Sequence, residues 1–166
     1  MRSRPGKIRI PNPSFLRLRL PAEAIPLALK IAGTQLNIQG HRIRLGLPSV
    51  RPLIPCPTLR SRLVMVKLAR AASKDEFPQA FLAAVRKQLE GLGIEANVEL
   101  ELAKTRTETE KFARRTVRIK DAVLPGYGVV LRGLSDEDSI KVQQHGLGGR
   151  RKFGCGIFIP VEGDNN

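Results

Sequence analysis

The chain has 166 residues, and 29 Lys and Arg against 15 Asp and Glu give it a formal net charge of +14 at pH 7. A hydrophobic content of 42% is enough for a packed core, which argues against a disordered chain. The sequence has no run of about 18 apolar residues and no apolar N-terminal stretch, so it indicates neither a membrane protein nor an exported one.

The positive charge is concentrated in the first part of the chain. Residues 1–70 hold 14 of the 29 Lys and Arg residues and a single acid, Glu23. Such an excess favours a polyanionic partner, with a solvated basic face as the alternative. The chain has no Trp and one Tyr, so for a nucleic-acid partner we expect recognition of the backbone and of hairpin shape rather than stacking of bases on aromatic side chains.

The Cys and acidic residues of the chain are not spaced as metal ligands. Cys56 and Cys155 are far apart and have no metal-ligand spacing. They are typical of small buried side chains in a reducing cytoplasm, where we expect the protein to work. The acidic residues 136–138 suit the first turn of a helix better than a metal site. We therefore predict neither a metal nor a cofactor.

Arginine alternates with apolar residues in the N-terminal part. A strand over residues 15–20 would pack its leucines on one face and leave Arg17 and Arg19 on the other. Residues 7–10 and 41–45 repeat the pattern, and the latter exposes Arg42 and Arg44. We interpret these four arginines as candidate RNA contacts.

A helix and a hairpin are predicted next. Residues 22–32 have helical composition, and Gly33 is well placed to end the helix. A tight turn at residues 39–40 would join strands over 36–38 and 41–43. Four prolines between residues 48 and 57 then mark an extended connection. We place the boundary there, with a first unit over residues 1–55 and a second over 58–160.

The second unit alternates strands with helices. We expect a strand over residues 59–68 and a helix that begins near Ser73 or Asp75 and carries an apolar stripe of Phe77, Phe81, Val85 and Leu89 up to Gly91. The remaining expected elements are a strand over 94–102, a charged stretch over 104–115, a strand region over 117–131 that Pro125 and Gly126 could break, a helix from Ser135 to Gly146, and a strand over 153–159.

This order predicts the fold class. Strand, helix, strand, strand, helix, strand is the ferredoxin-like, RRM-like βαββαβ arrangement, in which two helices back a four-stranded antiparallel sheet. We therefore expect an α+β protein of tandem ferredoxin-like units. The first unit is incomplete and too small for a comfortable core of its own, so it should dock on the second.

A glycine-rich loop with three consecutive cations precedes the last strand. Glycines let backbone N–H groups approach phosphate oxygens, and the cations supply charge and forked hydrogen bonds. We predict that this loop clamps RNA backbone through Gly146, Gly148, Gly149, Arg150, Arg151 and Lys152. A dinucleotide-binding loop is disfavoured because such loops follow a strand and open a helix, whereas this one follows a helix.

Arg114 and Arg115 are weaker candidates for the same role. With Arg118 and Lys120 alternating after them, they could hold the flank of an RNA stem. Ordinary surface charge is the alternative.

The C-terminal motifs resemble those of a known RNA-processing family. The resemblance is carried by Leu134–Ser139, Gly146–Lys152 and Gly154–Gly156, with further similarity at Gly40–Gly46 and Val50–Leu53. The family is that of the CRISPR-associated endoribonucleases that cut repeat RNA into guide RNAs, the Cas-six family of the RAMP superfamily. The myxobacterial-type subfamily is the most similar, and the resemblance covers about Phe15 to Pro160.

The resemblance implies RNA binding more firmly than cleavage. Members usually begin with a further strand and helix where the catalytic His commonly lies, and this chain starts after that point. A misplaced start, a shortened protein and relocated chemistry are all compatible with this. Cleavage without metal needs a base for the 2′-OH and an acid for the leaving oxygen. His41 and His145 are possible groups, each with a simpler structural explanation. Tyr127 and the Lys residues are possible substitutes with no distinguishing spacing, and we assign no catalytic residue.

The function implied by the resemblance is the binding and cleavage of precursor CRISPR RNA (crRNA). The 2′-OH would attack the neighbouring phosphate and leave a 2′,3′-cyclic phosphate, and the partners would be the crRNA repeat hairpin and subunits of a guide-RNA effector complex. The alternatives are a non-catalytic crRNA-binding subunit and a general structural RNA-binding protein.

Overall fold

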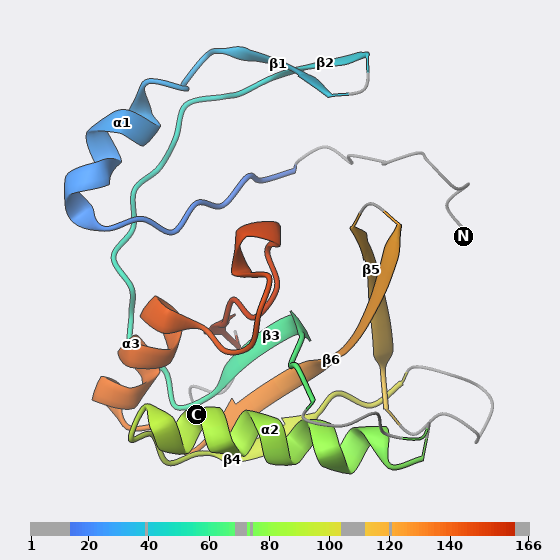
Figure 1. The fold of residues 1–166 in the computed structure, drawn as a ribbon. Coiled ribbons are helices and arrows are strands. Elements are labelled where there is room, and N and C mark those ends of the chain that lie inside the picture. Colours follow the sequence, from blue (N-terminus) through green and yellow to red (C-terminus); the bar gives the residue numbers. More distant parts are fainter. Residues whose placement is uncertain are drawn as a thin grey trace. The chain divides into compact units, whose positions relative to one another are not determined.

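The structure is a computed structural model that describes residues 14–38, 40–68, 73, 75–103, 112–119 and 121–161. Contacts within the chain divide it into two compact units, residues 1–51 and 52–166. The division falls inside the proline-rich connection. Both units combine helices with antiparallel strands (Figure 1).

The first unit contains a short helix and a β-hairpin. Its elements in chain order are η1 (Ala22–Ala24), α1 (Ile25–Leu29), β1 (Gln35–Ile38) and β2 (His41–Arg44). Gly33 follows the helix with a left-handed φ of +72°. Gly40, at φ +83°, donates its N–H to Asn37 Oδ1 at 2.9 Å and so closes the hairpin turn. The predicted helix and hairpin are confirmed, although the helix is shorter than expected.

The strand expected over residues 15–20 is wrong. These residues form no strand, and Leu16 and Leu18, expected to pack, are 61% and 54% exposed. The alternation of Leu with Arg determines only which side chains would share a face. A strand also needs a neighbour that accepts its backbone hydrogen bonds, and no described segment pairs with these residues.

The second unit is built on a five-stranded antiparallel sheet. Its elements in chain order are β3 (Leu59–Val64), α2 (Phe77–Gly91), β4 (Asn97–Leu100), β5 (Arg114–Ile119), β6 (Ala122–Arg132), α3 (Asp136–His145), η2 (Arg151–Phe153) and β7 (Ile159–Pro160). The strand order is β4-β6-β3-β7, and β5 pairs with β6 off this path. This mixed helix-and-strand fold is compatible with a ferredoxin-like unit.

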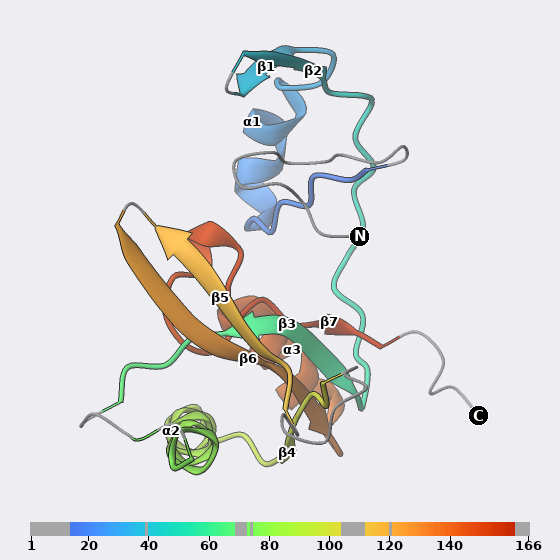
Figure 2. The same cartoon turned by 90° about the vertical axis from the view of Figure 1, so that its right-hand side faces the viewer.

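The two helices cover one face of the sheet and form the core with it. Phe81, Val85 and Leu89 of α2 and Val142 of α3 are buried in one cluster with residues of β3, β4 and β6. Phe81 meets Tyr127 edge-on, with ring centroids 5.1 Å apart. Figure 2 shows α2 end-on beneath the sheet. The predicted apolar stripe of α2 is therefore confirmed.

The break expected near Pro125 and Gly126 does not occur. β6 runs through both residues and pairs with β5 from Ala122 to Tyr127, so this hairpin adds a fifth strand to the four predicted. β3 and β4 pair with β6 only from Tyr127 onwards, which leaves β5 as the single described neighbour at Pro125. Proline fits there because its missing N–H can lie on the open edge.

A side-chain cap begins α3, and a reciprocal pair of hydrogen bonds precedes α2. Ser135 Oγ accepts the Asp138 N–H at 3.1 Å at the start of α3. Before α2, Ser73 Oγ accepts the Glu76 N–H at 3.3 Å while the Glu76 carboxylate accepts the Ser73 N–H at 3.2 Å. α2 itself begins at Phe77, closer to the later of the two predicted starts, and Pro78 lies in its first turn, where proline is tolerated.

The strand expected over residues 153–159 is reduced to the two residues of β7. Gly154 and Gly156 have φ values of +78° and +66°, and η2 occupies the residues just before them. Left-handed glycines do not continue a β-ladder, so the chain reaches the sheet only at Ile159.

Glu101, just after β4, binds two arginines across the face of the sheet opposite the helices. Its carboxylate accepts from Arg60 of β3 and, at 2.6 Å, from Arg115 of β5, which also donates to the Arg62 carbonyl. Gly128 of β6 leaves the space for this ion pair, because a Cβ there would overlap the Glu101 carboxylate. Desolvation acts to raise the pKa of Glu101, but the hydrogen bonds and charges of the two arginines outweigh it, so the pKa is lowered.

A lowered carboxyl pKa makes the contribution of Glu101 depend on pH. The stabilisation is present above the ordinary pKa of glutamate and is lost as pH falls through the lowered pKa of the folded state. We expect Glu101→Gln to lower the free energy of unfolding by about 2 kcal/mol at pH 7, the scale of hydrogen bonds to charged groups, and the difference from wild type to vanish in acid. Urea unfolding between pH 7 and 3 measures this.

Glu99→Gln is the matched control. Glu99 and its partner Arg132 are both nearly half-exposed, with the two groups 3.1 Å apart, so this surface pair should contribute little at any pH. Equal effects of the two substitutions at pH 7 would contradict the stabilising role of Glu101.

Candidate nucleic-acid interface

The candidate site is built on the segment between α3 and β7, residues 146–158, named here the α3–β7 loop. It carries glycines at 146, 148, 149, 154 and 156 and the three cations Arg150, Arg151 and Lys152. Gly146 ends α3 at φ +63° and donates its N–H to the Val142 carbonyl at 2.8 Å. The loop therefore leaves the helix in a defined direction.

Backbone hydrogen bonds tie the loop to β3 and its continuation. The Gly149 N–H donates to the Met65 carbonyl at 2.8 Å, and the Gly156 N–H donates to the Leu63 carbonyl at 2.7 Å. Within the loop, the Leu147 N–H donates to the Gly156 carbonyl at 3.0 Å. These bonds bring both arms of the loop together on the sheet.

The glycines make this close approach possible. A Cβ at Gly148 would overlap the Met65 carbonyl, and one at Gly156 would overlap the Leu147 carbonyl. The Gly148 N–H is also used internally, because it donates to Gln88 Oε1 of α2 at 2.7 Å. The N–H groups of Gly146, Gly148 and Gly149 thus have protein acceptors, which differs from the phosphate contacts expected of them.

The three cations lie at the exposed turn of the loop. Arg150 has a left-handed φ of +61°, unusual outside glycine, and opens η2. Arg151 donates from Nη1 to the His145 carbonyl at 2.6 Å and so caps the end of α3. Among the described residues, the side chains of Arg150 and Lys152 have no ion pair or hydrogen-bond partner, and both are exposed. Their charges are available to an anion.

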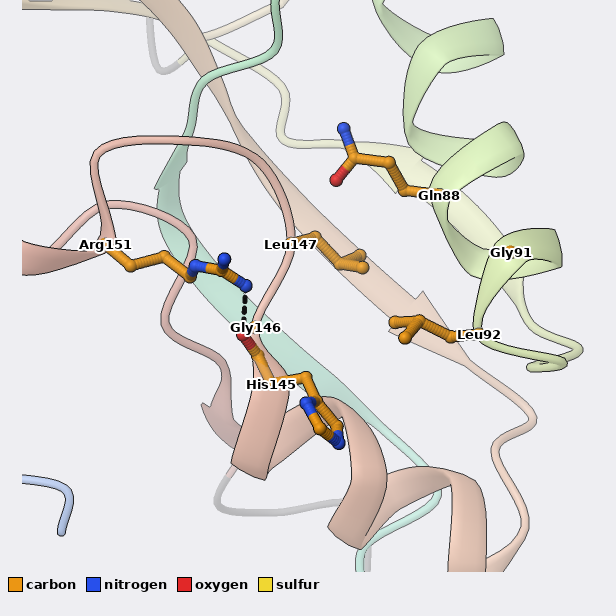
Figure 3. A pocket seen from close by; sticks show the side chains of 7 residues that line it. All are labelled: Gln88, Gly91, Leu92, His145, Gly146, Leu147 and Arg151. Carbon is orange, nitrogen blue, oxygen red and sulfur yellow. Dashed lines mark hydrogen bonds between the residues drawn. The ribbon is translucent and has the colours of Figure 1, made fainter.

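A hollow of about 310 Å³ opens beside the loop (Figure 3). Gln88, Gly91 and Leu92 line it from the end of α2, and His145, Gly146, Leu147 and Arg151 line it from α3 and the loop. His145 is the last residue of α3, as predicted. No local pattern in the sequence predicts this hollow, because its two walls are more than 50 residues apart in the chain.

The hairpin of the first unit separates its arginines from its histidine. Arg42 and Arg44 are exposed and pair with Asn37 and Gln35, so these four side chains share one face. His41 pairs with Ile38 on the other, largely apolar face. Arg42 and Arg44 therefore form a small basic face.

The other predicted arginines lie in different surroundings. Arg17 is exposed, whereas Arg19 is partly buried. Arg114 lies over the Phe77 ring with its Cζ 5.3 Å from the centroid, and Arg115 is bound to Glu101. The guanidinium groups of Arg114 and Arg115 thus make contacts within the protein.

Sequence reasoning missed three arginines on the open face of the second sheet. Arg60, Arg62 and Arg132 are exposed there. The signal was present, since residues 59–62 alternate Leu, Arg, Ser and Arg, the pattern that singled out the hairpin arginines. Of these three, Arg60 and Arg132 each face a carboxylate in an ion pair found among the described residues.

Within the described residues, no group of three or more His, Cys, Asp or Glu side chains is arranged to hold a metal ion. None of the helices in this part of the chain is long and apolar enough to cross a bilayer. The arrangement offers cationic side chains on a backbone fixed by hydrogen bonds, which suits binding of phosphate groups.

The packing of the loop can be tested at two of its glycines. Gly154→Ala has open space around the new Cβ, so it carries only the cost of a left-handed residue, about 1–2 kcal/mol. Gly156→Ala carries a similar cost and also pushes a Cβ into the Leu147 carbonyl, so we expect a loss of more than about 3 kcal/mol. Chemical denaturation measures both, and equal losses would contradict the close packing at Gly156.

Comparisons with known proteins agree with the motifs of this loop. A family model described as Cas6 Crispr matches residues 1–163. The CRISPR-associated endonuclease Cas6 of Myxococcus xanthus strain DK1622 is 41% identical over 145 residues, which cover 87% of this chain and 56% of that protein. The chain thus spans a little over half the length of this curated relative. The resemblance inferred from the sequence is confirmed, and the chain belongs to the Cas6 family.

Proposed function

We propose that the protein binds the repeat hairpin of precursor crRNA and takes part in cutting it into guide RNA. The observation that carries the proposal is the α3–β7 loop, where exposed cations lie on a backbone fastened to β3. The name of the Myxococcus relative, a CRISPR-associated endonuclease, supports the substrate class. A charge of +14 supports attraction of a polyanion.

The proposed RNA contacts are those expected from the sequence, with roles refined by the geometry. Arg150 and Lys152 would bind phosphates directly, and Arg151 would do so while capping α3. Gly146, Gly148 and Gly149 would shape the loop at the interface. Arg17, Arg19, Arg42 and Arg44 would add contacts from the first unit, and Arg114 and Arg115 would flank the stem from β5.

The proposed chemistry needs no metal. The 2′-OH attacks the adjacent phosphorus as its proton is removed, and the bond to the 5′-oxygen breaks as that oxygen gains a proton. The products are a 2′,3′-cyclic phosphate and a 5′-OH. Positive charge beside the phosphorane stabilises the transition state. We assign neither proton transfer to a particular residue.

Binding without cleavage is the second candidate function. It is favoured by the surroundings of the two histidines, since among the described residues no side chain hydrogen-bonds to either ring. They also belong to different units. A catalytic histidine usually has such a partner, which orients its ring.

The proposal extends to the domain organisation of the protein and to its partners. We infer that residues 58–160 form one ferredoxin-like domain and residues 1–55 part of another, because a helix followed by a hairpin is the middle of the βαββαβ order. The protein would work in the cytoplasm with other subunits of a guide-RNA effector complex.

Cleavage is tested by incubating the full chain with end-labelled repeat RNA in EDTA. We expect a single cut that leaves a 2′,3′-cyclic phosphate, detected as an end that resists phosphatase until acid opens the ring, after which phosphatase removes the phosphate and shifts the mobility. Tight binding of intact RNA would favour the second candidate. Equal affinity for repeat and unrelated hairpins would instead indicate a general structural RNA-binding protein and contradict the proposal.

The loop cations give the sharpest binding test. Arg150→Gln with Lys152→Gln removes two charges without touching the cap made by Arg151. We expect weaker binding of repeat RNA and a salt dependence flatter by roughly one slope unit per lost phosphate contact. Fluorescence anisotropy across a range of salt concentrations measures both quantities.

Arg86→Gln with Lys141→Gln is the control of equal charge. These residues lie on α2 and α3 and line neither the loop nor the hollow. If both double variants change the slope equally, the loop has no special place in binding.

A further inference from the structure

The hollow beside the α3–β7 loop is open to solvent and lies next to the loop cations. Its volume of about 310 Å³ is at the lower end of the range of about 300–1,000 Å³ found for small-molecule sites. Arg151 lines it and lies between the two exposed cations of the loop. A nucleotide whose phosphate contacts Arg150 or Lys152 would therefore have the hollow within reach of its base.

One wall supplies hydrogen-bond donors. Arg151 donates one N–H to the His145 carbonyl, and this hydrogen bond fixes the guanidinium. The other N–H donors of the guanidinium remain for a ligand. Figure 3 shows the Arg151 guanidinium and the His145 ring on the same side of the hollow. A fixed guanidinium suits the paired acceptors of a base edge, most often O6 and N7 of guanine.

The opposite wall supplies acceptors and apolar surface. Gly91 is the last residue of α2 and Leu92 follows it. The carbonyls of Gln88, Leu89 and Glu90 accept from the N–H groups of residues 92–94, which leaves those of Gly91 and Leu92 without a partner among the described residues. The side chains of Leu92 and Leu147 extend toward each other from the two walls (Figure 3). Guanine offers N–H donors at N1 and N2 to such carbonyls and flat faces to the leucines.

The walls are held at a fixed separation. Gln88 of α2 accepts the Gly148 N–H at 2.7 Å, so the helix and the loop are joined directly above the hollow. Gly149 and Gly156 fasten the same loop to β3 and its continuation. A base would enter a largely preformed site, which reduces the cost of binding.

We propose that the hollow binds the base of one unpaired nucleotide, best matched by guanine, next to the phosphates held by the loop cations. The inference rests on the proposed RNA-binding function and names a base contact within it. It assigns a direct role in RNA recognition to His145, Leu92 and the end of α2, and this role does not depend on aromatic stacking.

The experiment uses the full chain and the repeat RNA of the same genome. Each unpaired nucleotide beside the hairpin is replaced in turn by an abasic residue, and affinity is measured by fluorescence anisotropy. We expect one position to lose about tenfold in affinity on base removal, the scale of a single bidentate base contact. At that position, restoring guanine should recover affinity better than adenine, cytosine or uracil.

Protein variants link that nucleotide to the hollow. Leu92→Trp, which fills the space, and the smaller change His145→Ala should each weaken binding of intact RNA about tenfold but have no further effect on the abasic RNA. Gln144→Ala, at an exposed neighbour that does not line the hollow, should behave as wild type.

Two failures are distinguishable. If the chain binds the hairpin but no single base removal weakens binding, or if the losses from His145→Ala and base removal simply add, the hollow is not a base site and the proposed function stands. If the chain does not bind the repeat hairpin at all, the proposed function itself fails.

Discussion

The site depends on the hydrogen bonds that fasten the α3–β7 loop to β3 and the residue that follows it. Gly149 and Gly156 donate to the Met65 and Leu63 carbonyls, and the glycines are required because side chains would collide with neighbouring backbone. The loop is thus a rigid extension of the sheet. Its cations are presented from this base, and the hollow exists because the loop stands at a fixed distance from α2.

In this loop the backbone N–H groups hold the fold together, and the cationic side chains remain for phosphate binding. A glycine loop can bind phosphate through its N–H groups, but here those of Gly148 and Gly149 already have protein acceptors. Phosphate recognition then falls to Arg150 and Lys152, whose charges lack described partners. The arginines of the sheet are different, because Glu101 holds Arg60 and Arg115 across its open face. A positive net charge therefore does not make every arginine equally available.

Much of the second unit could be predicted from the sequence because its signals are local. The apolar stripe of α2, the Ser135 cap and the Gly40 turn each depend on residues a few positions apart. The wrong predictions concern strands, because whether a segment forms a strand depends on a neighbour that is distant in the sequence. Residues 15–20 lack a described strand neighbour, and β6 tolerates Pro125 because β5 is the only described strand that pairs with it there. The cations and glycines of the site were found from the sequence, but the acceptors of the glycine N–H groups were not, since Met65 and Gln88 are about 60–85 residues away in the chain.

Amide hydrogen exchange at the loop glycines tests the central claim most directly. If the loop is fastened to β3, the N–H groups of Gly148, Gly149 and Gly156 exchange about as slowly as those of β3 in the free protein, and adding repeat RNA changes them little. Fast exchange in the free protein, with protection only after RNA is added, would contradict the account, because it would mean that these groups bind phosphate rather than the protein.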